Sequence, residues 1–421
     1  MARAVVAVVL AAGEGKRMRT QGPKVLVDLL GRPLLWHVLA ALPANCRKRI
    51  VVGGRTLAQL RDIFGAERGV EFARQAKPLG TAHAVRSALK QVPAKGADVL
   101  IVCGDAPLIR RETLEAALAA HRRTGADVTV LSAKVADPTG LGRIIRGSDG
   151  RLLRIVEQKD CSADQLRISE INAGQFVVRA EALHRLLPQV GRNNAQREYY
   201  LTDLVALAGA KAQAFLLADA EEARGVNQPD ELDAARRLLQ ARILHRLRAG
   251  GVIIPAPEHV VVESGVEVGE GTVLHPFVVL RSGATIAARC SVGPCAVLRK
   301  GARLDEGARV GNFVEVKASR LGQRAKVLHL SYLGDADVGA DVNVGAGTIT
   351  ANFDGVAKHR TRIGAGVSVG AGTIFVAPVK VADKARTGAG AVVTRDIGRG
   401  ATVVGVPARP LGAKTKVRRH K

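Results

Sequence analysis

The sequence predicts two folds in one chain: an α/β domain with a parallel sheet, followed by a parallel β-helix. In the first half of the 421 residues, apolar runs alternate with segments of helical character, which is typical of α/β domains. A glycine-rich loop follows the first apolar run. In the second half, an aliphatic residue recurs at every sixth position from Val262 to Val316, and self-similarity at a fixed period indicates a solenoid.

The predicted α/β domain begins with the apolar run Val5–Ala12, which is typical of a strand covered on both faces. Further strands are expected at 49–52, 98–102 and 127–133, with helices starting at Thr56 and covering 112–123. In such domains ligands bind at the carboxyl ends of the parallel strands. Gly13 and Asp105 each follow a predicted strand, so we expect a site at that edge of the sheet.

The residue types at this edge indicate phosphate chemistry. Gly13 and Gly15 would let backbone amides approach an anion, and the basic residues Lys16 and Arg17 would neutralise it. Asp105 suits a hard cation bound to phosphates, because Mg²⁺ takes one or two carboxylates together with phosphate oxygens. An ordinary strand-to-helix turn and a helix-capping aspartate remain open as alternatives.

The six-residue period predicts short strands joined by turns, three to a coil, with the aliphatic side chains pointing inward. Stacked strands lie about 4.8 Å apart, so equivalent side chains fill a narrow interior. The strict register fails after Val316, returns at Val338 and Val344, fails again and resumes at Ile363. Insertions in solenoids often form the binding face. We therefore expect function at these two interruptions, which contain His329, Tyr332, Asn352 and Lys358.

The composition and net charge of the chain limit the kinds of partner and cellular compartment that we expect. The formal charge of +25 fits an anionic substrate, a nucleic acid or a solvated basic surface. Because zinc-finger spacing and interleaved aromatic-basic motifs are missing, we expect no nucleic-acid partner. Five cysteines without a C-x-x-C pair indicate a reducing compartment, which predicts a cytoplasmic protein. No segment reaches the roughly 20 apolar residues of a membrane span.

The predicted domains are 1–227, a linker helix at 228–250, and 251–421 with a basic tail. The linker shows an apolar stripe at helical spacing opposite a face of arginines. Such a helix can lie on a membrane surface, but a helix packed between two domains is the preferred interpretation. The tail is expected to be a disordered end.

The chain resembles the sugar-1-phosphate nucleotidyltransferases, and within them the family of bifunctional N-acetylglucosamine-1-phosphate uridyltransferases and glucosamine-1-phosphate acetyltransferases. The resemblance runs from about Val5 to Val406. The motifs that carry it in the first half are LAAGEGKRM (10–18), PK (23–24), LGTAHA (79–84), GDAPL (104–108), GRI (142–144), IVE (155–157), EINAG (170–174), EYYLTD (198–203) and GVN (225–227). Those in the second half are GNFVEVK (311–317), HLSYLGD (329–335), NVGAGT (343–348) and NFDG (352–355).

The resemblance implies a Rossmann-like nucleotidyltransferase domain followed by a left-handed parallel β-helix of hexapeptide repeats. It also implies two reactions. Acetyl-CoA would acetylate glucosamine-1-phosphate, and UTP would then transfer its uridylyl group to N-acetylglucosamine-1-phosphate with release of pyrophosphate. The product, UDP-N-acetylglucosamine, would supply cell-wall and lipopolysaccharide precursors. Such solenoids form homotrimers, with acetyl-CoA and acceptor bound between neighbouring subunits.

In the first domain, the resemblance implies that Asp105 and Asn227 bind Mg²⁺, and that Arg17 and Lys24 meet the triphosphate. The attacking sugar phosphate is already an anion, so catalysis should rest on positioning and charge neutralisation rather than on a general base. The residues implied at the uracil are Gln75, Gly80 and Thr81, and those implied at the N-acetylated sugar are Gly142, Glu157 and Asn172. His83 is interpreted as structural.

In the second domain, the resemblance singles out His329 as general base. The near-neutral pKa of a histidine side chain suits removal of a proton from the amine of glucosamine-1-phosphate as it attacks the thioester. The phosphate would be held by Arg299, Lys317 and Lys358, the amino sugar by Tyr332, Asn343 and Asn352, and the coenzyme by Ala346 and Ala371. Capping of irregular loops remains an alternative role for the polar residues.

Four features depart from the family pattern. Cys103 stands where a tyrosine is common, Ala371 where a serine is common, and Gly405 where an arginine is expected to meet the coenzyme. The early ladder between Val262 and Arg299 is also shorter by about one coil or more. These departures leave a second hypothesis open, in which the chain is only a nucleotidyltransferase and the β-helix is a scaffold for oligomerisation or regulation.

Overall fold

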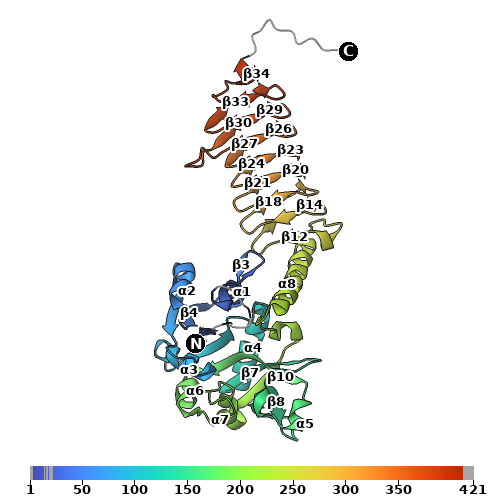
Figure 1. Ribbon diagram of the computed structural model, residues 1–421. Coiled ribbons are helices and arrows are strands. Elements are labelled where there is room, and N and C mark those ends of the chain that lie inside the picture. Colours follow the sequence, from blue (N-terminus) through green and yellow to red (C-terminus); the bar gives the residue numbers. More distant parts are fainter. Residues whose placement is uncertain (1–2, 14, 16–17, 19–21, 411–421) are drawn as a thin grey trace. The chain divides into compact units, whose positions relative to one another are not determined.

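The computed structural model describes residues 3–13, 15, 18 and 22–410 (Figure 1). The chain divides into two compact units, Met1–Leu238 and Leu239–Lys421. Helix α8 (Pro229–Ala249) contains the division. None of the helices formed by the described residues combines the length and the apolar character that a transmembrane helix requires.

The first unit is built on a mostly parallel sheet in the order β11-β7-β10-β6-β1-β4-β5, with β8 and β9 paired beside β10. Strand β10 is antiparallel to β6 and β7. The strands of this sheet are β1 (Ala4–Ala11), β4 (Cys46–Gly53), β5 (Val70–Arg74), β6 (Ala97–Cys103), β7 (Val128–Lys134), β8 (Arg143–Arg146), β9 (Leu152–Val156), β10 (Glu170–Arg179) and β11 (Ala212–Leu216). A separate hairpin joins β2 (Asp28–Leu29) to β3 (Arg32–Pro33). The strands predicted at 5–12, 49–52, 98–102 and 127–133 are confirmed.

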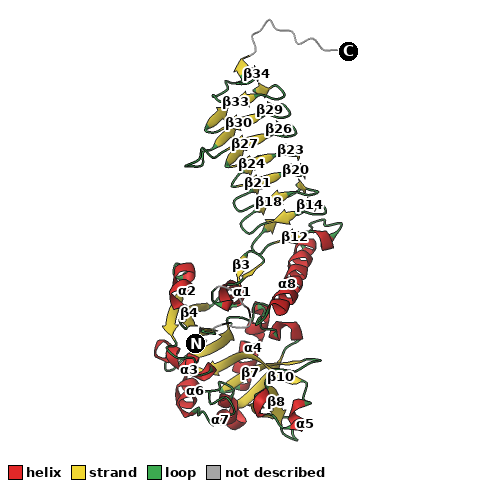
Figure 2. Cartoon of the chain, in the orientation of Figure 1, coloured by secondary structure: helices red, strands yellow, loops and turns green. Residues whose placement is uncertain are grey.

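Helices cover both faces of this sheet (Figure 2). Helices α3 (Thr81–Ala88), α6 (Ala180–Leu186) and α7 (Asp203–Ala208) contribute to the apolar core on one face. Helices α1 (Leu34–Ala41), α2 (Leu57–Phe64) and α4 (Arg111–Thr124) contribute to the core on the other. The short helix α5 (Ala163–Leu166) follows β9. With both faces covered, the central strand β1 is apolar throughout, and its residues from Val6 to Val9 are at most 4% exposed.

The topology gathers chain segments at one edge of the sheet. Strands β1, β4, β5 and β6 are parallel, so their carboxyl ends share that edge. The antiparallel strand β10 begins there. Gly13, Gln75 and Asp105 follow parallel strands, and Asn172 lies near the start of β10. The predicted site residues of the first unit therefore come from different parts of the chain to one edge.

The second unit is a parallel β-helix with three sheets (Figure 1). The first sheet contains β12 (Val261–Val262), β15 (Val279–Leu280), β18 (Val297–Leu298), β21 (Glu315–Lys317), β24 (Tyr332–Gly334), β27 (Ile349–Ala351), β30 (Ile374–Val376) and β33 (Val392–Val393). The second contains β13 (Glu267–Val268), β16 (Thr285–Ile286), β19 (Arg303–Leu304), β22 (Arg320–Leu321), β25 (Ala336–Val338), β28 (Thr361–Ile363) and β31 (Val379–Val381). The third contains β14 (Val273–Leu274), β17 (Ser291–Val292), β20 (Arg309–Asn312), β23 (Lys326–His329), β26 (Asn343–Val344), β29 (Ser368–Val369), β32 (Arg386–Thr387), β34 (Thr402–Val404) and the antiparallel β35 (Arg409–Pro410).

The inward aliphatic ladder is confirmed, but the first predicted interruption is wrong. Leu321, Val327 and Leu333 are fully buried and continue the ladder after Val316. The steps from Val316 to Leu321 and from Leu333 to Val338 are each five residues instead of six. The six-residue count therefore misses these inward positions although the coil continues. His329 therefore lies in a regular coil and not in an insertion.

The second interruption is a real insertion. Inward-facing Thr350 and Ile363 are separated by an outward loop in which Phe353 bridges to Lys358. Asp354 organises the loop by accepting hydrogen bonds from the amides of Val356 (2.8 Å) and Ala357 (2.7 Å) and pairing with His359 (2.6 Å). These contacts hold the pKa of Asp354 well below its usual range.

Candidate functional site

Three predicted residues of the first unit converge at the edge of the sheet. The ammonium group of Lys24 lies between two oxygens: it pairs with the Asp105 carboxylate and donates to Asn227 Oδ1 at 2.8 Å. Lys24 is 7% exposed, so these charges meet in a largely desolvated place. The amide of Val226 donates to the Asp105 carbonyl at 2.8 Å, which fixes the loop segment of Asn227 beside Asp105.

This donor set suits a hard cation that also binds phosphates. In the described part of the chain, no three His, Cys, Asp or Glu side chains form a metal-binding group. One carboxylate and one amide oxygen nevertheless match Mg²⁺, which usually keeps water or phosphate oxygens as its remaining ligands. The Lys24 ammonium shows that the two oxygens accept a positive charge between them.

Gly15 of the glycine-rich loop packs closely against Lys24. Gly15 has φ +61°, and a Cβ atom there would lie 2.6 Å from the Lys24 Cβ. A larger residue would therefore push Lys24 away from Asp105. The predicted phosphate-binding Arg17 lies outside the described residues.

Gln75, Gly80 and Thr81 form a second group. Gln75 Nε2 donates to the Gly80 carbonyl at 3.1 Å and lies 3.1 Å from His83 Nδ1. Burial and the nearby Arg86 charge lower the pKa of His83, so its ring is neutral near pH 7. Gly80 has φ +108°, and a Cβ atom there would lie 2.5 Å from the Tyr199 carbonyl oxygen.

Gly142, Glu157 and Asn172 form a third group. The Asn172 amide donates to the Gly142 carbonyl at 2.8 Å, and Asn172 Oδ1 accepts from the Gly174 amide at 2.9 Å. A Cβ atom on Gly142 would lie 3.3 Å from both Glu157 carboxylate oxygens. Burial raises the pKa of Glu157, and Thr202 opposes this by donating a hydrogen bond at 3.4 Å.

Two connections join the three groups. Segment 199–202 links the second to the third, because the Leu201 amide donates to Thr81 Oγ1 at 3.0 Å and Thr202 contacts Glu157. Cys103 links the first to the third: it precedes Asp105 by two residues, and its thiol donates to the Gly174 carbonyl at 3.3 Å. Burial raises the pKa of Cys103 to about 12, so its sulfur stays an uncharged thiol.

Arg143 supports the third group and was not singled out by the sequence. It is 2% exposed, and its guanidinium group donates to the carbonyl oxygens of Leu141 and Leu166 and, at 3.3 Å, to Gln158 Oε1. These partners flank Gly142 and Glu157. A buried arginine that ties three loop segments together positions the residues between them.

Replacing Arg143 with methionine should remove the donor from the Leu141 and Leu166 carbonyl oxygens and destabilise the first unit by about 2–3 kcal/mol. The KM for N-acetylglucosamine-1-phosphate should rise about tenfold, since Gly142 and Glu157 lose their support. Thermal denaturation and pyrophosphate-release kinetics measure the two effects. The exposed Arg154→Met on β9 is the matched control and should behave as wild type.

In the second unit, cations stack on one sheet. Arg299 and Lys317 occupy equivalent positions of successive coils, about 4.8 Å apart. The next equivalent residue is Gly334, where a Cβ atom would clash with the Tyr332 hydroxyl and lie 2.8 Å from Asn352 Nδ2. The glycine therefore leaves space that the side chains of Tyr332 and Asn352 fill.

The inserted loop completes this group. It carries Lys358 to Lys317, and the neighbouring ammonium of Lys317 lowers the pKa of Lys358. Arg299 is paired with Glu315 at 2.8 Å, and Asn352 with Asp335. The half-buried Lys317 and the exposed Lys358 lie close together, and two neighbouring ammonium groups are a favourable place for a phosphate dianion.

His329 lies at the corner between the third and first sheets. The amides of Gly347, Gly372 and Gly390 donate to the carbonyls of His329 (3.3 Å), Ala346 (2.7 Å) and Ala371 (2.8 Å). These three acceptor residues therefore occupy equivalent positions in successive coils. The predicted base and the two predicted coenzyme-binding residues form one column, whose small alanines leave room along the corner.

Asn343 lies elsewhere in the single chain. It sits at the start of β26, paired with Lys326, and lines a separate cavity of about 290 Å³ with Arg324 and Asp341. Gly405, with φ +90°, accepts from the Val392 amide at 3.1 Å near the C-terminal end of the β-helix. The structure thus arranges the other predicted residues of the second unit in two sets, the one around Lys317 and the column of His329, and no contact in the described residues joins Asn343 to either.

Two family models match the chain. The model described as MobA-like NTP transferase domain matches residues 7–220, and the bacterial transferase hexapeptide model, with six repeats, matches residues 265–300. The second match agrees with a left-handed coil of hexapeptide repeats.

Curated relatives match the chain over nearly its whole length. The Bifunctional protein GlmU of Pelobacter propionicus is 40% identical, with 95% of each chain covered. The protein of the same name from Trichlorobacter lovleyi is 41% identical, with 93% of each chain covered. The one from Stenotrophomonas maltophilia is also 41% identical, with 92% of this chain and 93% of the relative covered.

Proposed function

Because the chain belongs to the family of bifunctional GlmU proteins, we propose for it the two transfers that form UDP-N-acetylglucosamine. The second unit acetylates glucosamine-1-phosphate with acetyl-CoA. The first unit transfers the uridylyl group of UTP to N-acetylglucosamine-1-phosphate and releases pyrophosphate. The product is a precursor of the cell wall.

The convergence of Lys24, Asp105 and Asn227 is the main observation in support of the proposed uridylyl transfer. Asp105 and Asn227 would hold Mg²⁺, which supplies neutralisation of phosphate charge when bound. Lys24 is placed to contact the phosphates from the same side. The oxygen of the sugar phosphate attacks the α-phosphorus, pyrophosphate leaves, and no proton has to be removed from the nucleophile.

The remaining groups of the first unit orient the two substrates. Gln75 presents an amide beside Gly80, whose missing side chain lets the backbone approach a flat base. Glu157 and Asn172 offer polar atoms next to Gly142, where only a glycine leaves the carboxylate accessible. These groups lie at one edge of one sheet, which suits an in-line transfer between ligands held side by side.

The column of His329, Ala346 and Ala371 supports the acetyl transfer. A coenzyme that runs along the alanines would bring its thioester to the end of the column, where His329 stands. His329 takes a proton from the amine as nitrogen attacks the carbonyl, and the thiol of CoA leaves. Lys317 and Lys358 would hold the phosphate of the acceptor, with Tyr332 and Asn352 beside its sugar.

We further propose that the protein is a homotrimer, because Asn343 is separated from the other acceptor residues in one chain. A neighbouring subunit would bring its Asn343 to the site. All five cysteines are free thiols, which fits a cytoplasmic enzyme.

Replacing Lys317 with glutamine tests the phosphate clamp. The lowered pKa of Lys358 means that protonated Lys358 is disfavoured in the folded state. The variant should therefore unfold at a slightly higher temperature than wild type at pH 7, and this gain should vanish above the pKa of Lys358, where the repulsion is absent. The KM for glucosamine-1-phosphate should instead rise about tenfold to a hundredfold. A parallel Lys380→Gln variant, exposed on the second sheet, should change neither quantity.

Replacing Ala371 with serine tests the coenzyme column. A hydroxyl there adds one hydrogen-bonding group beside the coenzyme, so the KM for acetyl-CoA should fall about threefold to tenfold. Ala389→Ser, at the next position of the column, is the comparison. If neither variant changes acetyl-CoA kinetics, the column does not bind the coenzyme.

Separate assays of the two half-reactions test the proposed function. Purified protein should release CoA from acetyl-CoA only with glucosamine-1-phosphate, and pyrophosphate from UTP only with N-acetylglucosamine-1-phosphate and Mg²⁺. Pyrophosphate release without CoA release would instead support a nucleotidyltransferase with a non-catalytic β-helix.

A further inference from the structure

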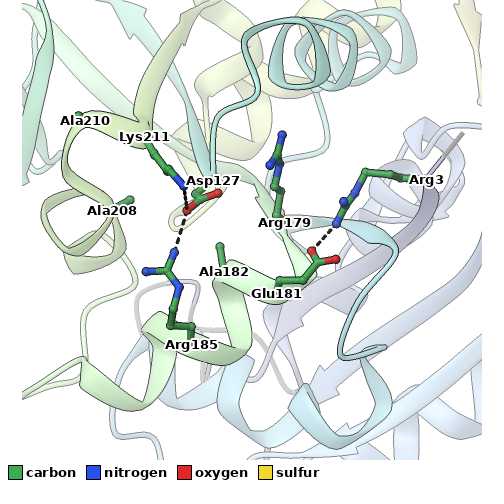
Figure 3. A pocket seen from close by; sticks show the side chains of 9 residues that line it. All are labelled: Arg3, Asp127, Arg179, Glu181, Ala182, Arg185, Ala208, Ala210 and Lys211. Carbon is green, nitrogen blue, oxygen red and sulfur yellow. Dashed lines mark hydrogen bonds and ion pairs between the residues drawn. The ribbon is translucent and has the colours of Figure 1, made fainter.

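A basic cavity lies in the first unit away from the site described above (Figure 3). Its volume is about 590 Å³, within the range of small-ligand sites, roughly 300–1,000 Å³. The lining residues are Arg3, Asp127, Arg179, Glu181, Ala182, Arg185, Ala208, Ala210 and Lys211. Arg3, Asp127 and Lys211 precede parallel strands and Arg179 ends the antiparallel β10. The cavity is therefore at the edge of the sheet opposite Asp105.

The charges that line the cavity do not balance. Four cations face two carboxylates. Asp127 is shared by Arg185 at 2.7 Å and Lys211 at 3.9 Å. Glu181 pairs with Arg3 and also accepts from the Gly96 amide at 2.8 Å. Both carboxylates are thus already engaged, and the lining keeps an excess of positive charge.

Arg179 carries the unmatched charge. Its backbone amide donates to Asp127, but within the described residues its guanidinium group makes no hydrogen bond or ion pair. Figure 3 shows the Arg179 side chain between the ion pairs of Asp127 on one side and the ion pair of Arg3 with Glu181 on the other. A Cβ atom on Gly125, at the end of α4, would lie 3.5 Å from Arg179 Nη2, so the guanidinium group lies beside the C-terminus of this helix, whose terminal carbonyls offer only a partial negative charge.

The buried His121 lies near the same arginines and responds to their positive charge. His121 is fully buried on α4, and its Nδ1 lies 2.8 Å from Thr129 Oγ1. Burial lowers the pKa of His121 to about 4; Asp98 opposes the shift, and the charges of Arg179, Arg3 and Arg122 add to it. The imidazole therefore stays neutral and does not add to the repulsion.

We propose that this cavity binds a phosphate-bearing anion and that Arg179 is its principal contact. A guanidinium group offers paired donors that match phosphate geometry, and Arg179 has these donors free. Arg185 and Lys211 can contribute from the opposite wall, since they share one carboxylate. The three alanines leave space without adding charge, so either a free anion or the phosphate of a nucleotide fits.

Isothermal titration of the full chain in EDTA tests this inference, with inorganic pyrophosphate and AMP as probes. We expect wild type to bind a probe and Arg179→Gln to bind it at least about tenfold more weakly, while Arg179→Lys retains part of the affinity. Arg154→Gln, an exposed arginine on β9, is the matched control and should bind as wild type. Tighter binding of AMP would assign the site to a nucleotide, and tighter binding of pyrophosphate to a free anion.

Equal affinities for wild type and Arg179→Gln would overturn the inference, because any binding would then reside elsewhere. Absence of binding of both probes to wild type would overturn it as well. Among the residues that the structure describes, Arg179 has no side-chain hydrogen bond or ion pair to lose, so Arg179→Gln should keep the melting temperature of wild type without ligand. Both half-reactions should also continue in the variant, which separates this inference from the proposed function.

Discussion

Replacing His329 with alanine should lower the rate of acetyl transfer by roughly 10³-fold, the usual contribution of a general base. The side chain is exposed at a corner of the β-helix, so its removal leaves no cavity in the aliphatic ladder. Only proton removal from the attacking amine is lost. CoA release measured with a thiol reagent gives the rate, and the melting temperature should stay unchanged.

The exposed His259 near the start of the β-helix provides the control. His259→Ala should release CoA as fast as wild type. If His329→Ala also does so, His329 is not the base, and the column of His329, Ala346 and Ala371 has no catalytic meaning.

Replacing Asp105 with alanine should reduce Mg²⁺-dependent pyrophosphate release by at least about 10³-fold. The substitution removes the only charged oxygen in the proposed metal-binding pair and also the partner of the buried Lys24 ammonium. CoA release by the second unit should be unaffected. Titration of the residual activity with Mg²⁺ should show a much weaker metal requirement.

Asp164→Ala, which removes a carboxylate that is 94% exposed, should retain full pyrophosphate release. Turnover by Asp105→Ala close to that of this control would refute the metal-binding role. Loss of CoA release in Asp105→Ala would instead indicate general unfolding.

The sequence predicts the β-helix because its interior is narrow. Each coil must supply an aliphatic side chain at the same place, and this constraint repeats visibly every six residues. The six-residue pattern fails where a turn is one residue shorter. Leu321 and Val327 are buried at inward positions of the coil, but a count of six residues from Val316 does not reach them. Packing tolerates the shorter turn because the strands still stack.

The candidate site is less visible in sequence, because it depends on contacts between distant segments. Asp105 was expected from its position after a strand, but the ion pair with Lys24 also depends on Gly15, which leaves room for the Lys24 side chain. Arg143 acts through carbonyl oxygens, which carry no sequence signal. Asp354 could have been found, since an aspartate before a glycine is typical of a turn.

The proposed roles in the second unit rest on the stacking of successive coils. Gly334 makes room for Tyr332 and Asn352 only because it occupies the position above Lys317. Similarly, His329 and Ala346 are 17 residues apart, and their alignment becomes clear once the shortened turns are known. The position of Asn343 could not be predicted in this way, because one chain does not bring it to the other residues proposed to bind the acceptor.

A complementation assay tests most directly the central proposal that the protein has two independent active sites, one for each transfer. His329→Ala and Asp105→Ala are purified separately and supplied with glucosamine-1-phosphate, acetyl-CoA, UTP and Mg²⁺. We predict that neither variant alone forms UDP-N-acetylglucosamine at an appreciable rate, and that their mixture does, because acetylated intermediate passes from one protein to the other. Equal product formation by either variant alone, or none by the mixture, would contradict the account.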